Sequence, residues 1–142
     1  MNTLTDHRGS CKCKAVRFTA QLDLSMSTML CNCTICSKTG WWSLRGSAST
    51  FRIDEGEAML AEYSPSSATH IRFCKRCGTS IYGFGHIPEM GGDYLTVSVR
   101  ALDDVDVELL SVTCLDGLHD TWAPLYTGPY RDPCEPRGAP AV

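Results

Sequence analysis

Three cysteines lie within six residues at Cys31-Asn32-Cys33-Thr34-Ile35-Cys36, and a cysteine pair flanks this stretch on either side. The first pair is Cys11 and Cys13, and the second is Cys74 and Cys77. Core packing does not require seven thiols in a two–three–two pattern, whereas closely spaced thiolates are typical zinc ligands. The sequence therefore predicts a protein whose fold is organised around zinc.

The composition favours metal binding over disulfide bonds. The chain has 142 residues, enough for one domain with a hydrophobic core, and its nine cysteines cannot all pair internally. Residues 1–10 are polar and lack the apolar segment of a signal peptide, and no apolar run approaches the roughly 20 residues of a membrane span. We therefore expect a cytoplasmic protein, in a compartment that keeps thiols reduced.

The formal net charge of −3 argues against nucleic acid as a partner, because non-specific binding to nucleic acid depends on neutralising phosphates. Basic residues do lie beside the cysteines, namely Lys12, Lys14, Lys38, Lys75 and Arg76. We interpret them as compensating the negative charge of metal–thiolate sites rather than as a phosphate-binding surface.

The pattern of apolar residues predicts a mainly β, antiparallel fold. Alternation within 15–20 and 94–101 places every second side chain on one face of a strand. The side chains expected to point inward are Val16, Phe18, Ala20, Leu95, Val97 and Val99. Further strands are expected at 25–31, 41–44, 51–53, 58–63, 70–73, 80–85 and 107–114. No segment has a sustained helical period, and only one helical turn is expected, within 118–126.

We expect a single domain over residues 9–127, with a flexible N-terminus over residues 1–8. Residues 128–142 are rich in proline and glycine and are expected to form a mobile tail. Cys134 belongs to this tail and has no expected role.

The two outer pairs, Cys11 with Cys13 and Cys74 with Cys77, suit a closed, structural zinc site. Residues two apart on an extended backbone point the same way, so the first pair can face one metal. Gly78 directly follows the second pair and permits the positive φ of a zinc knuckle. Because four thiolates complete a tetrahedral zinc, this ion would tie the first strand to the later half of the sheet.

Cys31, Cys33 and Cys36 supply only three ligands, and three protein ligands with one open position are typical of catalytic zinc. Water or a substrate thiol could be the fourth ligand. Four residues could instead complete a structural site: His70, His86, His119 and Cys114. An iron–sulfur cluster is less suitable because it usually takes four thiolates. Since three thiolates leave zinc a weak Lewis acid, an open site would suit thiol chemistry better than hydrolysis.

Few other residues indicate a site. Trp41, Trp42 and Trp122 could wall a pocket, although such aromatic residues more often pack in a core or lie at the surface. Arg45 and Arg72 could bind a carboxylate. The sequence contains no glycine-rich nucleotide loop and no serine- or metallo-hydrolase motif.

The cysteine motifs resemble those of the family of glutathione-dependent formaldehyde-activating (GFA) enzymes and centromere protein V. The resemblance lies in residues 9–18, 31–38 and 73–78, and it continues weakly at 97–103 and 116–117. It covers roughly residues 8–122, and the order of the three motifs is highly specific. Asn32 stands where the enzymes often have histidine, which is more similar to the centromere protein V branch.

The resemblance implies the all-β fold called Mss4-like, or β-tent. It implies two zinc ions, one structural on the two outer pairs and one, proposed to be catalytic, on the three central cysteines. The implied activity is that of a carbon–sulfur lyase, in which glutathione, a small thiol, condenses with formaldehyde to S-hydroxymethylglutathione. Two alternatives stay open: a non-catalytic zinc module that binds a protein partner, and a thiol-based sensor or repair protein.

Overall fold

The structure of the protein, a computed structural model, describes residues 3–131 and is mainly β. The strands are β1 Thr5–Ser10, β2 Arg17–Leu22, β3 Thr28–Cys31, β4 Ser43–Gly46, β5 Arg52–Glu55, β6 Leu60–Ser66, β7 Thr69–Cys74, β8 Ser80–Ile87, β9 Gly92–Ser98, β10 Ser111–Leu115 and β11 Pro124–Pro129. One α-helix, α1, spans Thr34–Thr39. Short 3-10 turns cover Glu57–Met59, Pro88–Met90, Val99–Ala101 and Val107–Leu109.

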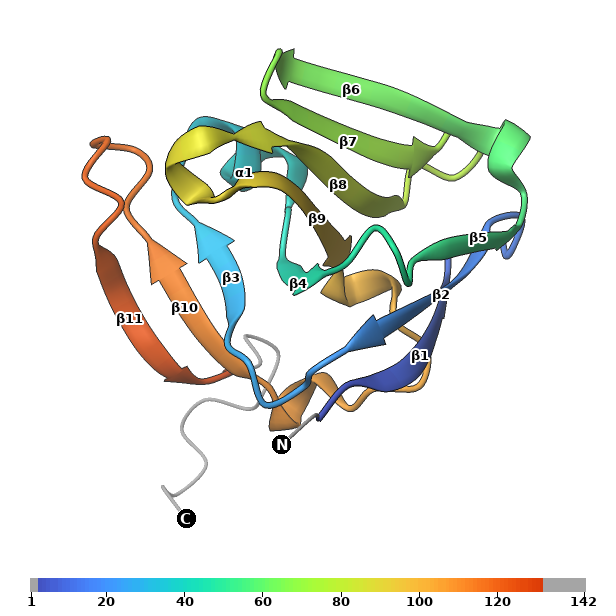
Figure 1. The fold of residues 1–142 in the computed structure, drawn as a ribbon, viewed down its shortest axis with the longest axis horizontal. Coiled ribbons are helices and arrows are strands. Elements are labelled where there is room, and N and C mark those ends of the chain that lie inside the picture. Colours follow the sequence, from blue (N-terminus) through green and yellow to red (C-terminus); the bar gives the residue numbers. More distant parts are fainter. Residues whose placement is uncertain (1–2, 132–142) are drawn as a thin grey trace, which may run out of the picture.

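The strands form two sheets, which Figure 1 shows side by side. The smaller sheet has the order β1-β2-β5, and the larger has the order β11-β10-β3-β4-β9-β8-β7-β6. Within residues 3–131, neighbouring strands run antiparallel except for the parallel pair β3 and β10. The expected mainly β, antiparallel-rich fold is confirmed, and each expected strand has a counterpart.

The core lies where the two sheets meet. All six side chains expected to point inward are buried, and so are Leu22, Leu44 and Ile81. Trp42 is buried beneath β3, and its indole N–H donates to the hydroxyl of Thr28 at 2.7 Å. This bond satisfies a buried polar group that would otherwise destabilise the core. β2, the centre of the larger sheet and β10 therefore share one hydrophobic cluster.

The N-terminus differs from the prediction, because residues 5–8 are not a loose end. They belong to β1, which pairs with β2 from Thr5 opposite Leu22 to Ser10 opposite Arg17. Gly9 lies so close to the Phe18 ring that a Cβ there would come within 2.2 Å of it. The sequence did not indicate this strand because β1 is polar and exposed over most of its length.

The C-terminal part also differs from the prediction. Residues Pro124–Pro129 form β11, an edge strand paired with β10, where one helical turn was expected within 118–126. Prolines occur at both ends of β11, a position that edge strands tolerate. Tyr130 then stacks on Trp42 with ring centroids 4.6 Å apart, so the first residues of the predicted tail are ordered by the core. The remainder, including Cys134, lies outside the described residues.

Candidate metal centres

The two outer cysteine pairs meet at one point. Cys11 and Cys13 follow β1, while Cys74 ends β7 and Cys77 lies in the turn before β8. All four Sγ atoms lie within 4.8 Å of one another. The Cys11–Cys13 and Cys13–Cys74 sulfur distances are 3.6 and 3.8 Å. A tetrahedral zinc with Zn–S bonds of about 2.3 Å requires sulfur separations of about 3.8 Å, so this cluster has the dimensions of a four-thiolate metal site.

Local backbone conformation brings each pair into position. Lys14 has a φ of 66° and donates its N–H to the carbonyl of Cys11 at 3.0 Å, which turns the chain sharply after the first pair. Gly78 has a φ of 81°, as expected of a zinc knuckle, and its N–H donates to the carbonyl of Cys74 at 2.7 Å. A Cβ on Gly78 would meet no atom within 4 Å, so the backbone angle is what requires glycine here.

The four thiols of this cluster cannot all ionise without a cation. The Thr79 hydroxyl, 3.2 Å from the sulfur, is the main cause that lowers the pKa of Cys77 to about 5. The backbone N–H of Ala15 favours the Cys13 thiolate, but burial and the neighbouring sulfurs outweigh it and raise the pKa of Cys13 to about 11. A bound dication removes this conflict, because it stabilises every thiolate at once.

The three central cysteines come together at the junction of β3 and α1. Cys31 ends β3, Cys33 is the N-cap of α1 and Cys36 lies in its first turn. Their sulfurs lie within 4.8 Å of one another. The backbone N–H of Cys33 donates to the sulfur of Cys31 at 3.4 Å, and that of Cys36 donates to the sulfur of Cys33 at 3.3 Å. These donors favour thiolates, the form in which cysteine binds metals.

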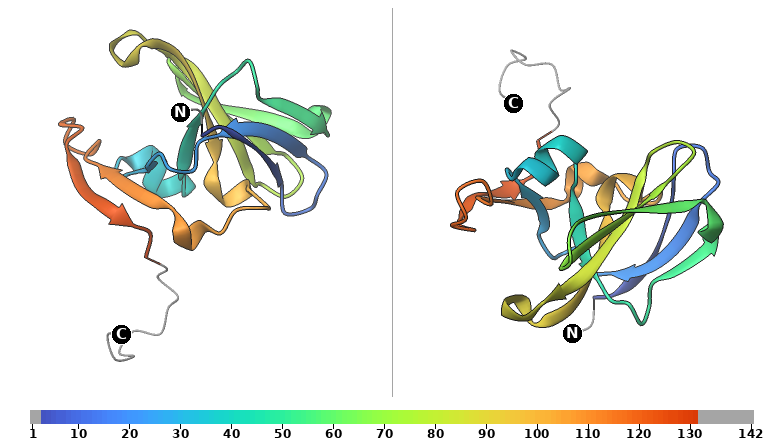
Figure 2. Two further views of the ribbon diagram at one scale, coloured as in Figure 1. Left: turned by 60° about the horizontal axis from the view of Figure 1, so that its bottom comes forward. Right: turned by 90° about the horizontal axis from the view of Figure 1, so that it is seen from above.

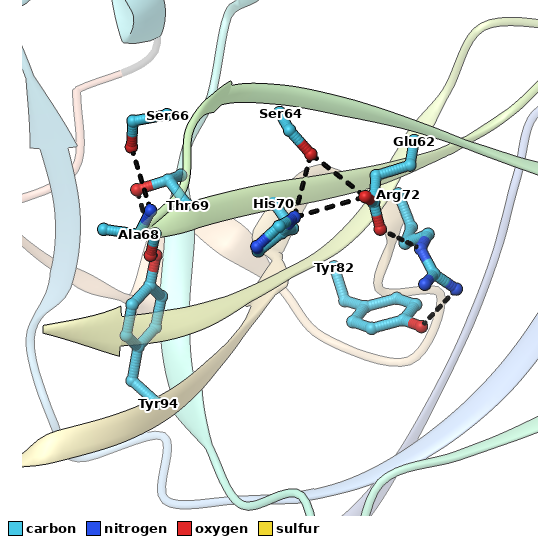
Figure 3. A network of polar contacts seen from close by, with 9 residues as sticks. All are labelled: Glu62, Ser64, Ser66, Ala68, Thr69, His70, Arg72, Tyr82 and Tyr94. Carbon is cyan, nitrogen blue, oxygen red and sulfur yellow. Dashed lines mark hydrogen bonds and ion pairs between the residues drawn. The ribbon is translucent and has the colours of Figure 1, made fainter.

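The alternative fourth ligands considered above do not join the three sulfurs, although Cys114 lines the same cavity as Cys31 and Cys36. In the described part of the chain, no further histidine, cysteine or carboxylate joins the three sulfurs. His86 contacts Asp93 at 2.6 Å, and His119 contacts Asp116 at 2.9 Å. His70 lies in the Glu62 network of β6, β7 and β8, where Figure 3 shows the carboxylate between His70 and Arg72. Arg72 therefore binds Glu62, with its Nε atom 2.7 Å from Oε1 of the carboxylate, and does not join either cysteine cluster.

The loop of residues 116–123 packs directly against the three cysteines. Gly117 allows this contact, because a Cβ there would come within 2.6 Å of the Cys31 sulfur and 3.0 Å of the Trp122 ring. Asn32 holds the loop with both ends of its amide: the Nδ2 group donates to Asp116 at 3.0 Å, and Oδ1 accepts from the N–H of Leu118 at 2.9 Å. Trp122 belongs to this loop and is 56% exposed, and it does not line the cavities described below.

Asp116 is the centre of this loop. The hydrogen bond from Asn32 is the largest cause that lowers the pKa of Asp116 to about 2, with His119 and Thr121 acting in the same direction against partial burial. The Thr121 hydroxyl donates to the carboxylate at 2.9 Å. An ionised carboxylate that organises three partners gives the loop a defined shape above the cysteines.

A cavity of about 350 Å³ opens beside the central cysteines. Its lining includes Cys31 and Cys36 together with Trp41, Trp42 and Arg100. A neighbouring cavity of about 560 Å³ shares Leu30 and Cys114 with it. Residues of α1 and β10 contribute to the lining, and Figure 2 shows α1 on the same side of the molecule as β10 and β11. A separate polar cavity at the β1–β2–β5 sheet has no cysteine in its lining.

Residues 6–115 match the family described as "Glutathione-dependent formaldehyde-activating enzyme". The chain belongs to this GFA family. The match includes both cysteine clusters, and the crystal structure of a Rhodobacter sphaeroides protein shares the fold. That protein is 24% identical, with a TM-score of 0.60 over 70% of this chain and 90% of the other.

Some features of this GFA chain were not indicated by its sequence. Arg100 lines the cavity but lies far along the chain from the cysteines, and Arg45, considered above as a carboxylate ligand, does not line it. Asp116-Gly117 was visible as part of the family resemblance, but only the fold shows that it packs on Cys31. Within residues 3–131 the longest α-helix has six residues, and no helix is long and apolar enough to cross a membrane.

Proposed function

We propose that this protein is a zinc-dependent GFA enzyme of the carbon–sulfur lyase type that acts on a small thiol adduct. The observation that carries the proposal is the three-sulfur cluster, which has no fourth side chain in residues 3–131 and opens on a cavity. Three protein ligands with access for a small molecule are typical of catalytic metal sites, whereas structural sites are closed.

Two zinc ions per chain are part of the proposal. The outer pairs would hold a structural ion, since Cys11 and Cys74 are fully buried and join β1 to β7. Cys31, Cys33 and Cys36 would hold the second ion, which would offer a soft coordination position to a thiolate and lower the pKa of a bound thiol. No aspartate, glutamate or histidine of residues 3–131 lines the cavity, which suits a reaction that needs little more than an activated thiol.

Glutathione and formaldehyde are the proposed reactants, in keeping with the family description. The glutathione sulfur forms a bond to the formaldehyde carbon, and the thiol proton ends on the formaldehyde oxygen. The N–H donors of Cys33 and Cys36 would spread the negative charge of the sulfur cluster. The rings of Trp41 and Trp42 would exclude water from the cavity, while Asn32 would keep the 116–123 loop closed over Cys31.

The test combines metal content with sulfur coordination. The purified protein is expected to contain two zinc ions, and Cys33→Ser should lose one of them while Cys114→Ser, on the cavity wall, keeps both. Adding glutathione should increase zinc–sulfur coordination in the X-ray absorption spectrum of the wild type, and exchange NMR should show faster formation of the formaldehyde adduct. One zinc per chain, bound iron, or a spectrum that glutathione leaves unchanged would contradict the proposal. Full metal content without catalysis would favour a non-catalytic binding module.

A further inference from the structure

Arg100, an exposed residue, is within residues 3–131 the one charged residue in the lining of the cavity that Cys31 and Cys36 also line. The cavity is otherwise lined by sulfur, small polar groups and apolar side chains such as Leu30 and Trp41. No aspartate or glutamate lines it, and none lines the neighbouring cavity, whose own charged residue is Arg131. The two neighbouring cavities therefore have arginine and, among the described residues, no carboxylate in their linings.

Aromatic groups hold the Arg100 guanidinium in place. It lies 5.1 Å from the centre of the Trp42 ring and 5.9 Å from that of Tyr130, and Nη2 donates to the Tyr130 hydroxyl at 3.2 Å. Trp42 is itself fixed by its hydrogen bond to Thr28. Stacking of this kind restricts the long side chain before a ligand arrives, so less entropy is lost on binding.

No carboxylate pairs with Arg100 in the described part of the chain. None of the ion pairs in residues 3–131 includes it, whereas Arg17, Arg52 and Arg72 each pair with a carboxylate. The neutral Tyr130 hydroxyl occupies one donor and leaves the remainder of the planar fork free. Such a fork matches the two oxygens of a carboxylate.

We infer that Arg100 is the specificity-determining residue of this cavity and that the thiol bound beside the central cysteines carries a carboxylate. This inference rests on the proposed function, because it assumes that the sulfur end of the ligand is held at the three-cysteine site. The carboxylate end lies toward Arg100, and a cavity of about 350 Å³ limits the ligand to a small molecule. Glutathione has the required groups, and so do smaller mercapto acids.

The sharpest probes are 3-mercaptopropionate and its methyl ester, which differ in one negative charge and have the same thiol-bearing chain. We expect isothermal titration calorimetry of the zinc-loaded proteins to show that the wild type binds the acid about tenfold more tightly than Arg100→Gln does. The reason is that the variant lacks the charge-assisted hydrogen bond from the guanidinium to the carboxylate. Binding of the ester should be nearly unchanged by the substitution. Differences in thiol acidity between the probes cancel when the two proteins are compared.

Arg45→Gln is the matched control, since Arg45 is an exposed arginine of β4 that does not line the cavity. It should bind both probes as the wild type does. Arg100→Lys should recover only part of the preference, because an ammonium group cannot form the bidentate contact. Circular dichroism and zinc content should be the same in all variants.

Four results would overturn the inference. If Arg100→Gln weakens the binding of the acid and of the ester equally, Arg100 supports the cavity or balances the charge of the metal site and does not bind a carboxylate. If Arg45→Gln loses as much affinity for the acid as Arg100→Gln does, the effect comes from the overall charge of the protein surface and not from a contact with Arg100. If the wild type binds the ester and Arg100→Gln binds the acid as tightly as the wild type does, the inference is overturned and the proposed function is left intact. If neither thiol binds to the wild type, the inference and the proposed function are both overturned.

Discussion

Gly117 is the residue at which the 116–123 loop touches the central cysteines. Replacing Gly117 with alanine would place a methyl group within 2.6 Å of the Cys31 sulfur, so the loop or the cysteine must move. We expect Gly117→Ala to destabilise the fold by about 1–3 kcal/mol, as overpacked sites generally do, and to weaken metal retention at the three-cysteine site. Thermal unfolding and zinc content after mild chelation measure these two effects.

Gly46→Ala provides the control for this prediction. A Cβ at Gly46 would make ordinary contacts of 3.4 Å with Leu95 and 3.5 Å with Leu22. The Gly46 variant should therefore keep both metals and nearly the full stability. Retention of metal in Gly117→Ala at the level seen in Gly46→Ala would contradict the role given to the loop contact.

Asn32 holds the 116–123 loop through one hydrogen-bond donor and one acceptor. The substitution Asn32→Asp keeps the shape of the side chain but replaces the Nδ2 donor with an oxygen. A carboxylate at position 32 would face ionised Asp116, whose low pKa depends first on the Asn32 hydrogen bond. We expect the pKa of Asp116 to rise and the loop to open, at a cost of about 1–3 kcal/mol. Faster amide hydrogen exchange at Leu118 and Trp122 is the readout, and unchanged exchange at both would count against this bracing role.

At the scale of elements, α1 shows how a short helix can be specified by its ends. The Cys33 sulfur accepts the N–H of Cys36 at its start, and Gly40, with a φ of 69°, ends it. A helix of six residues has no room for a periodic apolar pattern, which is why the sequence did not indicate it. The same geometry that caps α1 brings the three sulfurs together, so we expect helix formation to be coupled to the binding of a metal by these sulfurs.

The β6–β7 hairpin should show a dependence on pH that comes from Glu62 (Figure 3). The hydrogen bond from Arg72, followed by those from Ser64 and His70, lowers the pKa of Glu62 from 4.5 to about 2. Because the folded-state pKa is depressed, the stabilising contribution is complete above about pH 4.5 and is lost as the pH falls toward 2.

Glu62→Gln tests this contribution. The difference in melting temperature between the wild type and Glu62→Gln should be constant near neutral pH and shrink as the pH falls from about 4.5 toward 2. Glu55→Gln is the control, because Glu55 belongs to an exposed pair with Arg17 at 3.5 Å on another sheet. A difference for Glu62→Gln that does not shrink in acid would rule out the ionised network as its cause.

At the scale of the whole molecule, the two cysteine clusters should contribute very differently to stability. The outer cluster joins β1 and β2 to β7 and β8 across the two sheets, and its Cys11 and Cys74 are fully buried. The central cluster lies within one segment, at the end of β3 and in α1. A cross-link between distant parts of the chain stabilises the fold more than a local one.

We therefore expect Cys74→Ser to cost about 5 kcal/mol or more, which is comparable with the whole stability of a domain of this size. Cys33→Ser should remain folded and lose one metal ion. Calorimetric unfolding of the two variants, each with its zinc content determined, makes the comparison. Similar losses of stability in both would contradict this division of roles.

The sequence by itself determined the residues that could hold metal and the mainly β class of the fold. Cysteine spacing and strand alternation are local properties, so Cys31, Cys33 and Cys36 and the buried faces of β2 and β9 could be predicted from them. The Gly78 turn was predictable for the same reason, since its backbone angle depends on a short segment.

The tertiary structure alone decided what surrounds the central cysteines. Gly117 and Tyr130 reach that region because β10 pairs in parallel with β3 and β11 adds to its edge, and Arg100 reaches it because β9 pairs with β4. Such contacts depend on strand order, which joins residues some 70 to 100 positions apart and leaves no local periodicity in the sequence. For the same reason β1 and β11, polar strands held by their neighbours, became visible only in the assembled sheets.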